Sequence, residues 1–279
     1  FRFPTRDEVI RKLDQQATLY PAERYFQYSN LGLTLAGEIV RERSGQDYDS
    51  YVREHILQPL GLTDTDTGFP TDARQARIAT GYGFPGRNHE LRAMPRYDAR
   101  AITPAAGFAS TALDLAAFGA WQLEVLAGET DRVLAGNTLR EMQRVQWLRP
   151  GWKSGWGLGF GIKHQEDRDI VGHGGWIGGN RSHLLTVPSE KIAVITLLNA
   201  DDRSPYAFNR EAYRVVAPAL REATRTEAEM AQNALGPATE ALEKARTKEK
   251  EAELALQAAE AKAAKHLFVD LQGMRLFCL

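Results

Sequence analysis

The spacing of apolar residues changes along the chain, and this change limits the fold more than any other feature of the sequence. As far as about Phe118, apolar residues recur every three to four positions, which predicts helices. Between Gly157 and Leu198 they form short blocks separated by turn residues, which predicts strands, and a helix-forming segment follows from about Pro205 to Glu222. Helices, then strands, then a closing helix indicate an α+β fold: an antiparallel sheet flanked by helices, with a helical subdomain.

Three helices have recognisable ends. The first buries one face of residues 31–40 and is expected to stop near Gly45, which suits a left-handed C-cap. Asp47 is expected to cap a second helix that ends before Pro59. Thr111, with an aspartate three residues later, has the capping-box pattern of a third helix.

The strands are expected in four blocks. The connection Pro188–Lys191 is short, so the last two strands are predicted to form an antiparallel hairpin. The four blocks are residues 157–162, Ile170–Val171, His183–Val187 and Ile192–Leu198.

The composition changes at about Ala223. Residues 1–223 have the mixed composition of a compact domain, whereas residues 224–265 contain no aromatic side chain and consist mostly of Ala, Glu, Lys, Thr and Gln. This second segment is predicted to form a charged helical extension that is exposed, because it has few large apolar side chains to bury. A coiled-coil arm is the alternative, but no sustained heptad supports it. Residues 266–279 form an apolar tail, interpreted as two short strands on a partner or as the start of another domain.

Charge and composition exclude several classes of function. The chain has 35 Lys and Arg against 36 Asp and Glu, a balance that offers no basic surface for nucleic acid or an anionic membrane. No apolar run approaches the roughly 18 residues that span a bilayer. Cys278 is the sole cysteine, so no disulfide forms within the chain. The six histidines are scattered, and we predict no metal site and no cofactor.

Two short elements attract attention as candidate functional sites. Tyr28-Ser29-Asn30 opens the first long helix, where an N-cap made by Ser29 or Asn30 explains it equally well. The glycine-rich run Gly172–Gly179 contains His173 and enters a strand. Glycines are costly in a strand, so they indicate close approach of a ligand or of another backbone, and His173 is alternatively an ordinary turn residue.

Together and in order, these elements resemble the serine β-lactamase-like superfamily, which includes class C β-lactamases, D-alanyl-D-alanine carboxypeptidases, D-amino-acid amidases and related esterases. The resemblance covers roughly Phe3 to Ala223 and implies a β-lactamase/transpeptidase-like fold. The segments that carry it are Tyr28–Val40, Ser44-Gly45, Ile56–Leu62, Pro104–Phe118, Gly155–Gly161, His173–Gly175 and the hairpin through Asn199.

The resemblance implies acyl transfer through a serine nucleophile. A serine in a Ser-x-x-Lys motif attacks the carbonyl, and Tyr28 would act as general base for acylation and as acid to the leaving group. Asn30 would hold the lysine of that motif and the substrate amide.

On the strand side, the resemblance places His173 where the family has the lysine of Lys-Thr-Gly. Gly174 and Gly175 would line the bound substrate, and the backbone N–H of Trp176 would stabilise the oxyanion, so the side chain of Trp176 is not essential. Gly174 lacks the hydroxyl that can hold a substrate carboxylate. This favours esters or peptides with an uncharged end over β-lactams.

The sequence departs from the family at the nucleophile, because it contains no Ser-x-x-Lys. We expect that motif in a segment upstream of Phe1, so that this chain is an N-terminally truncated form and is inactive alone. Neither Ser110 nor Ser154 is followed by a lysine three residues later.

Two functional hypotheses follow. In the first, the intact protein hydrolyses a small ester, amide, β-lactam or D-amino-acid peptide through an acyl-enzyme, without metal or cofactor, in the periplasm or outside the cell as the resemblance implies. In the second, the fold serves as a non-catalytic binding or scaffolding module, with residues 224–279 contacting a partner. The presence of Ser-x-x-Lys in the longer gene product would discriminate between them.

Overall fold

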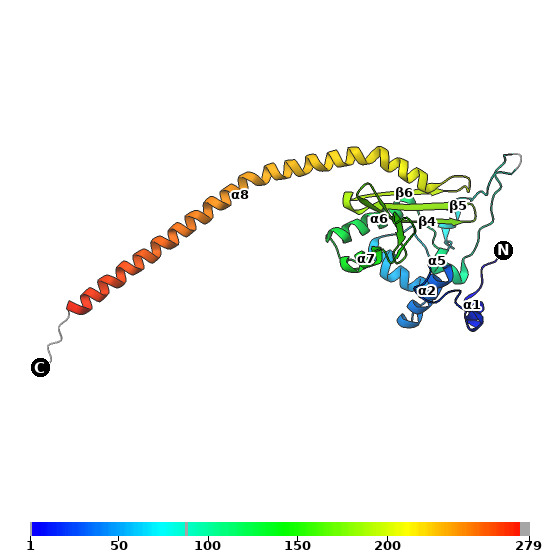
Figure 1. Cartoon of the computed structure of the whole chain (residues 1–279), viewed down its shortest axis with the longest axis horizontal. Helices are drawn as coiled ribbons and strands as arrows, with labels where there is room; N and C mark the ends of the chain where they lie inside the picture. The colour runs from blue at the N-terminus through cyan, green and yellow to red at the C-terminus, as the bar shows by residue number, and fades with distance from the viewer. Residues whose placement is uncertain (1, 87–88, 274–279) are drawn as a thin grey trace. The chain divides into compact units, whose positions relative to one another are not determined.

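The computed structural model describes residues 2–86 and 89–273 (Figure 1). It divides into two compact units, Phe1–Ala217 and Pro218–Leu279. The first unit contains a group of helices and one antiparallel sheet, which confirms the predicted α+β class.

The first helices begin and end as their local sequences dictate. After α1 (Arg6–Lys12), helix α2 (Asn30–Ser44) starts behind Ser29, whose Oγ accepts a hydrogen bond from the Gly32 amide at 3.0 Å. Helix α2 ends at Gly45, which has a φ of 72° and confirms the predicted left-handed cap. Ser29, rather than Asn30, is therefore the N-cap.

The second predicted helix is built from three consecutive turns. Helix α3 (Tyr48–Val52) continues through a π-helical turn (Arg53–Leu57) into α4 (Gln58–Leu60), so it runs past the predicted end. Asp47 occupies the predicted N-cap position, but its side chain makes no capping hydrogen bond. Its carboxylate instead lies 3.3 Å from the guanidinium of Arg41, which carries a full charge and competes for it.

Helices α5 (Thr103–Ala106), α6 (Ala112–Ala127) and α7 (Gly136–Gln143) complete the helical part. Thr111 caps α6, accepting from the Asp114 amide at 3.2 Å. The carboxylate of Asp114 does not complete the capping box, because it accepts from the Asp64 amide at 2.9 Å and from the Thr65 hydroxyl at 2.7 Å. Two buried clusters form in the helical part: Val52, Leu57 and Leu62 in and just after α3–α4, and Trp121, Val125 and Leu139 between α6 and α7.

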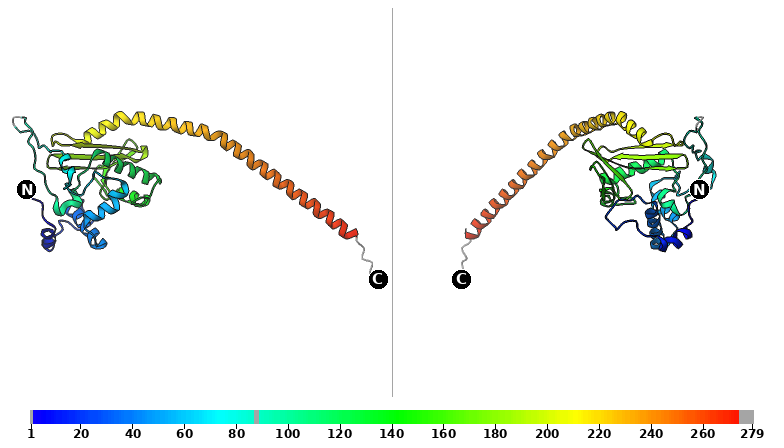
Figure 2. Two further views of the ribbon diagram at one scale, coloured as in Figure 1. Left: turned by 180° about the vertical axis from the view of Figure 1, so that it is seen from behind. Right: turned by 45° about the vertical axis from the view of Figure 1, so that its right-hand side comes forward.

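The six strands form one sheet in which every neighbouring pair is antiparallel and the spatial order follows the sequence. Helix α6 packs on one face, where a Cβ at Gly119 would lie 3.0 Å from that of Ala193. The first turns of the last helix cover the other face (Figure 2). The strands are β1 (Trp147–Leu148), β2 (Ser154–Trp156), β3 (Gly161–Gln165), β4 (Arg168–Ile177), β5 (Asn180–Val187) and β6 (Ile192–Leu198).

The strand predictions are partly corrected. The hairpin of β5 and β6 around Pro188–Lys191 is confirmed. Residues 157–160, predicted as strand, form the turn between β2 and β3: the Gly157 amide donates to the Phe160 carbonyl at 2.8 Å, and Gly159 has a φ of 81°. Only glycine adopts that conformation readily, so these glycines make a turn and not a strand.

Helix α8 extends over Pro205–Gly273, so the helix predicted to stop near Glu222 does not end there. Residues 266–273 belong to it as well, which corrects the strand interpretation for that part of the tail; residues 274–279 lie outside the described residues. Described side chains of the second unit are exposed, and i,i+4 ion pairs such as Lys244–Glu240 at 2.7 Å support the helix. Within residues 2–86 and 89–273, no helix is long and apolar enough to cross a bilayer.

Candidate active site

Tyr28 and Asn30 flank the N-cap of α2, so the start of that helix fixes their backbone. Tyr28 is 45% exposed. Asn30 is the first helical residue, and its backbone carbonyl accepts from the Thr34 hydroxyl at 2.9 Å. In the described part of the chain, the Asn30 side chain makes no hydrogen bond, so nothing ties it to Tyr28 or His173.

The fold brings Tyr28 and His173 together although 145 positions separate them in the sequence. His173 lies on β4, and its ring is stacked with that of Tyr28, with ring centroids 6.1 Å apart and planes inclined by 30°. The fold therefore places a phenol and an imidazole, two kinds of side chain that can transfer protons, side by side.

A third ring joins this pair, and the sequence analysis did not single it out. Trp156, at the end of β2, has its ring centroid 5.7 Å from that of Tyr28 and 5.6 Å from that of His173. Phe26 is stacked on the far side of Trp156, at 5.5 Å and 11°. The aromatic residues before α2 and in the Gly155–Gly157 segment were the available signal, but nothing in the sequence indicates that they meet.

His173 is held in one tautomer. Its Nδ1 lies 2.7 Å from the carbonyl oxygen of Gly174. Because a carbonyl only accepts, Nδ1 carries a hydrogen, and of the two neutral tautomers only the one with Nε2 as acceptor fits this contact. In that tautomer the ring offers a proton acceptor, whereas a protonated lysine in its place would offer only donors.

The two glycines after His173 are explained by the neighbouring strand. A Cβ at Gly174 would lie 3.3 Å from the imidazole of His183, and one at Gly175 would lie 2.6 Å from the hydroxyl oxygen of Ser182. Close approach of β5 thus accounts for both glycines, one of the two reasons considered for this run.

Trp176 is positioned by the turn that follows it. Gly178 and Gly179 form a two-residue loop with φ values of 55° and 75°, so Ile177 and Asn180 are the hydrogen-bonded closing pair. In an antiparallel pair of strands, hydrogen-bonded and non-hydrogen-bonded residue pairs alternate, so Trp176 and Arg181 form a non-hydrogen-bonded pair. The Trp176 amide therefore points away from β5, to the other edge of β4. Among the described strands, β3 covers that edge only as far as Gly172.

The side chain of Trp176 has a partner of its own. Its Nε1 donates to the carboxylate of Asp201 at 2.6 Å, and the guanidinium of Arg181 lies over the ring, 5.3 Å from the centroid. The ring does not contact that of His173, so Trp176 can reach the site only through its backbone.

Comparison with known proteins decides the family. A family model described as Beta-lactamase matches residues 2–218.

The chain belongs to the beta-lactamase family.

It is 28% identical over 185 residues to "Penicillin-binding protein 4" of Amycolatopsis lactamdurans, an alignment that covers 64% of this chain and 48% of that protein. It is 30% identical over 202 residues to the human "Putative beta-lactamase-like 1", covering 71% of this chain and 38% of that protein. The chain thus spans less than half the length of these two curated relatives. Among solved structures, the octameric penicillin-binding protein homologue from Pyrococcus abyssi has a TM-score of 0.63 at 25% identity, over 76% of this chain and 47% of that one.

Membership of the beta-lactamase family confirms the resemblance seen in the sequence and places the chain in a family of serine hydrolases.

Behind the candidate active site of this beta-lactamase family member, a buried polar network joins the sheet to α8. Asn209 is fully buried, and its Nδ2 lies 3.0 Å from Nδ1 of His183, 2.9 Å from the His183 carbonyl oxygen and 2.9 Å from that of Val194. Burial, and as the smaller cause the nearby His173, together lower the pKa of His183 to about 4. His183 is therefore neutral at physiological pH.

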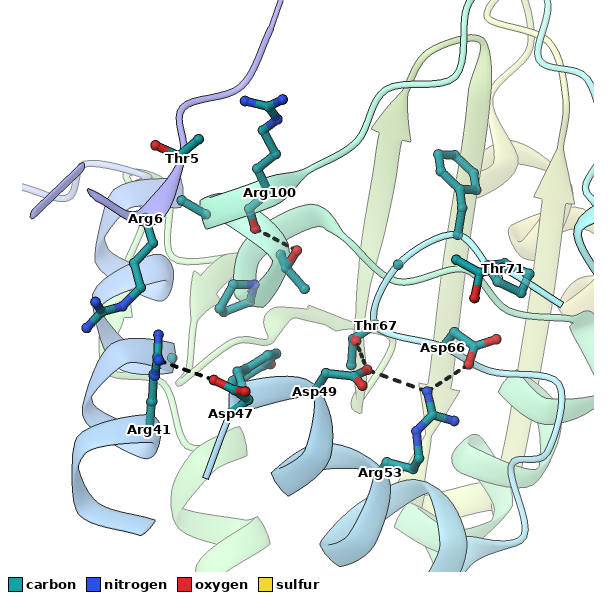
Figure 3. Close-up of a pocket in the computed structure, with 18 of the residues that line it drawn as sticks. Thr5, Arg6, Arg41, Asp47, Asp49, Arg53, Asp66, Thr67, Thr71 and Arg100 are labelled. Carbon is teal, nitrogen blue, oxygen red and sulfur yellow. Dashed lines mark hydrogen bonds and ion pairs between the residues drawn. The ribbon is translucent and has the colours of Figure 1, made fainter. Parts of the chain in front are cut away.

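One cavity of the first unit lies away from the predicted site residues. A cavity of about 730 Å³ is bordered by α2, α3 and the 66–72 loop, where Arg53 lies 3.0 Å from Asp66 and 3.5 Å from Asp49 (Figure 3). Its arginines are matched by carboxylates, and none of the predicted site residues lines it. Within the described residues, no group of His, Cys, Asp and Glu side chains is arranged to hold a metal ion.

Proposed function

We propose that this chain supplies the acid–base side and one oxyanion donor of a serine acyl-transfer site. The protein that contains it would hydrolyse a small ester, amide or D-amino-acid peptide through an acyl-enzyme. The observation that carries the proposal is the stacked pair of Tyr28 and His173, with His173 held as the Nδ1–H tautomer.

The proposed reaction begins when the serine hydroxyl attacks the substrate carbonyl. The oxygen of Tyr28 takes the hydroxyl proton while Tyr28 passes its own proton to the lysine of Ser-x-x-Lys, and the same route later returns a proton to the leaving amine or alcohol. The Trp176 amide, on the uncovered edge of β4, would donate to the oxyanion of the tetrahedral intermediate. Water then attacks the acyl-enzyme with the proton transfers reversed.

The strand at the site supports a substrate with an uncharged end. His173, with its Nδ1 on the Gly174 carbonyl, can offer only Nε2 to a substrate, and Gly174 has no hydroxyl to donate to a carboxylate. A β-lactam or peptide that carries a carboxylate at this point would lose an ion pair and a hydrogen bond.

Covalent labelling tests the proposal. The sequence has no Ser-x-x-Lys, so the 279-residue chain should gain no mass with a fluorophosphonate or a labelled penicillin. A longer gene product, in which a Ser-x-x-Lys segment precedes this chain, should be acylated at one serine of that segment. Stoichiometric labelling of a serine within the 279 residues would contradict the assignment of roles.

The second candidate is a binding or scaffolding module, favoured by one observation. The second unit is a charged helix whose described side chains are exposed, as expected of a segment that contacts a partner or acts as a spacer. If the longer gene product also remains unlabelled by both reagents, the module is the better description.

A further inference from the structure

The ring of Trp156 contacts both members of the proposed acid–base pair. The three centroid distances among Tyr28, Trp156 and His173 are 5.6, 5.7 and 6.1 Å, so the rings form a nearly equilateral triangle. Each ring comes from a different part of the chain: the segment before α2, strand β2 and strand β4. Trp156 is thus placed to set the separation of the other two.

Trp156 is itself held by packing and not by polar bonds. Phe26 stacks on it at 5.5 Å with an 11° angle between the planes. Its Nε1 is enclosed and has no hydrogen-bond partner in the described part of the chain. An enclosed, unpaired N–H is unfavourable, so packing of the ring must outweigh that cost. Buried N–H groups without a hydrogen-bond partner are rare in folded proteins, so the position of Trp156 needs an explanation.

We propose that Trp156 is a positioning residue for the Tyr28–His173 pair. Its ring fixes the distance and inclination of the two and keeps the His173 imidazole turned so that Nδ1 meets the Gly174 carbonyl. The catalytic meaning of this role rests on the proposed function, but the geometric role does not. Without the indole, the imidazole can rotate about its side-chain bonds, and the Nδ1 hydrogen bond competes with water.

Two substitutions of Trp156 distinguish the effect of its flat ring from the effect of its unpaired N–H. Trp156→Phe keeps a flat ring and removes the unpaired N–H, whereas Trp156→Leu removes the planar surface. Trp152→Leu is the matched control, because that tryptophan is 82% exposed and makes none of these ring contacts. If Trp156→Leu does not fold, Trp156→Met fills the space without a flat ring and replaces it.

The readout is nuclear magnetic resonance of the 279-residue chain at about pH 8, where histidines of ordinary pKa are neutral. Ring ¹⁵N shifts report the tautomer of His173, assigned with a His173→Gln variant, and nuclear Overhauser effects report contact between the rings of Tyr28 and His173. We expect the wild type, Trp156→Phe and Trp152→Leu to show the Nδ1–H tautomer and the ring contact. Trp156→Leu should show mixed tautomers and lose at least half of the Overhauser intensity. An unchanged tautomer and contact in Trp156→Leu would overturn the proposal.

Activity of the longer gene product provides a separate arm. Trp156→Leu should lower kcat by about 10²-fold, since misplacement of catalytic groups by about 1 Å has effects of that size, with a smaller change in KM. A wild-type protein that is never acylated would refute the proposed function and leave the resonance result intact. An active Trp156→Leu protein with wild-type kcat would refute the positioning role.

Discussion

Replacing His183 by glutamine should remove a loss of stability that the wild-type chain suffers as the pH falls. His183 lies on β5 opposite Gly174, and burial, with the charge of His173 as the second cause, lowers its pKa from 6.5 to about 4. The unfolded chain therefore takes up a proton at His183 near pH 6.5, whereas the folded chain resists until about pH 4. Stability contributed by neutral His183 is complete above pH 6.5 and is lost as the pH falls from 6.5 towards 4.

The size of the loss follows from the pKa difference. A drop from 6.5 to about 4 is about 2.5 in pKa, which corresponds to about 3.4 kcal/mol. His183 is only half-buried, and solvent screening reduces the expected value to roughly 2 kcal/mol. Glutamine suits the comparison because its amide oxygen can still accept from Nδ2 of Asn209, as Nδ1 of His183 does at 3.0 Å.

The assay is urea unfolding followed by circular dichroism at several pH values from 7.5 to 4.5. Carboxylates whose pKa is lowered in the fold, such as Glu8 and Glu141, also cost stability in acid, so the difference between variant and wild type is the quantity of interest. That difference should move by roughly 2 kcal/mol in favour of His183→Gln as the pH falls. His164→Gln, at an exposed histidine, is the control and should show little change. Parallel curves for wild type and His183→Gln would refute the reasoning.

Two further predictions concern the site and the sheet beneath it. In the longer gene product, Tyr28→Phe should lower kcat on an ester substrate by roughly 10²–10⁴-fold and change the free energy of unfolding by about 1 kcal/mol or less, as measured by steady-state kinetics and thermal unfolding; near-full kcat would remove Tyr28 as the general base. Gly172→Ala should destabilise the chain by about 3 kcal/mol in urea unfolding, because the new Cβ would lie 2.0 Å from the Leu184 carbonyl oxygen. Gly68→Ala, where no atom lies within 4 Å, is its control and should change stability by less than about 0.5 kcal/mol.

The ends of helices and strands were predicted correctly where the residues that determine the end are neighbours in the sequence. The left-handed cap at Gly45 and the hairpin around Pro188–Lys191 are examples. The same kind of signal failed where a distant group competed. The carboxylate of Asp47 forms an ion pair with Arg41, and the carboxylate of Asp114 accepts hydrogen bonds from the Asp64 amide and the Thr65 hydroxyl.

Two predicted boundaries are wrong. The sequence predicts a strand at residues 157–160, yet the left-handed backbone of Gly159 makes this run a turn. The sequence predicts one helix up to about Glu222 and a separate helical extension after it, yet the residues on both sides are helix formers and α8 continues without a break. The change in composition at about Ala223 lowers the amount of apolar surface that the helix can bury. It does not interrupt the backbone hydrogen bonds of the helix.

The sequence by itself determined the α+β class, the family and the candidates Tyr28 and His173, since periodicity and motif order are properties of the chain alone. Only the tertiary structure decided that these two rings stack, that Trp156 completes the triangle and that His173 keeps its hydrogen on Nδ1. It also decided that His183 is half-buried with a lowered pKa. The physical reason is that ring contact, burial and tautomer depend on groups that the fold brings in from other strands and helices, and no local pattern records which groups those will be.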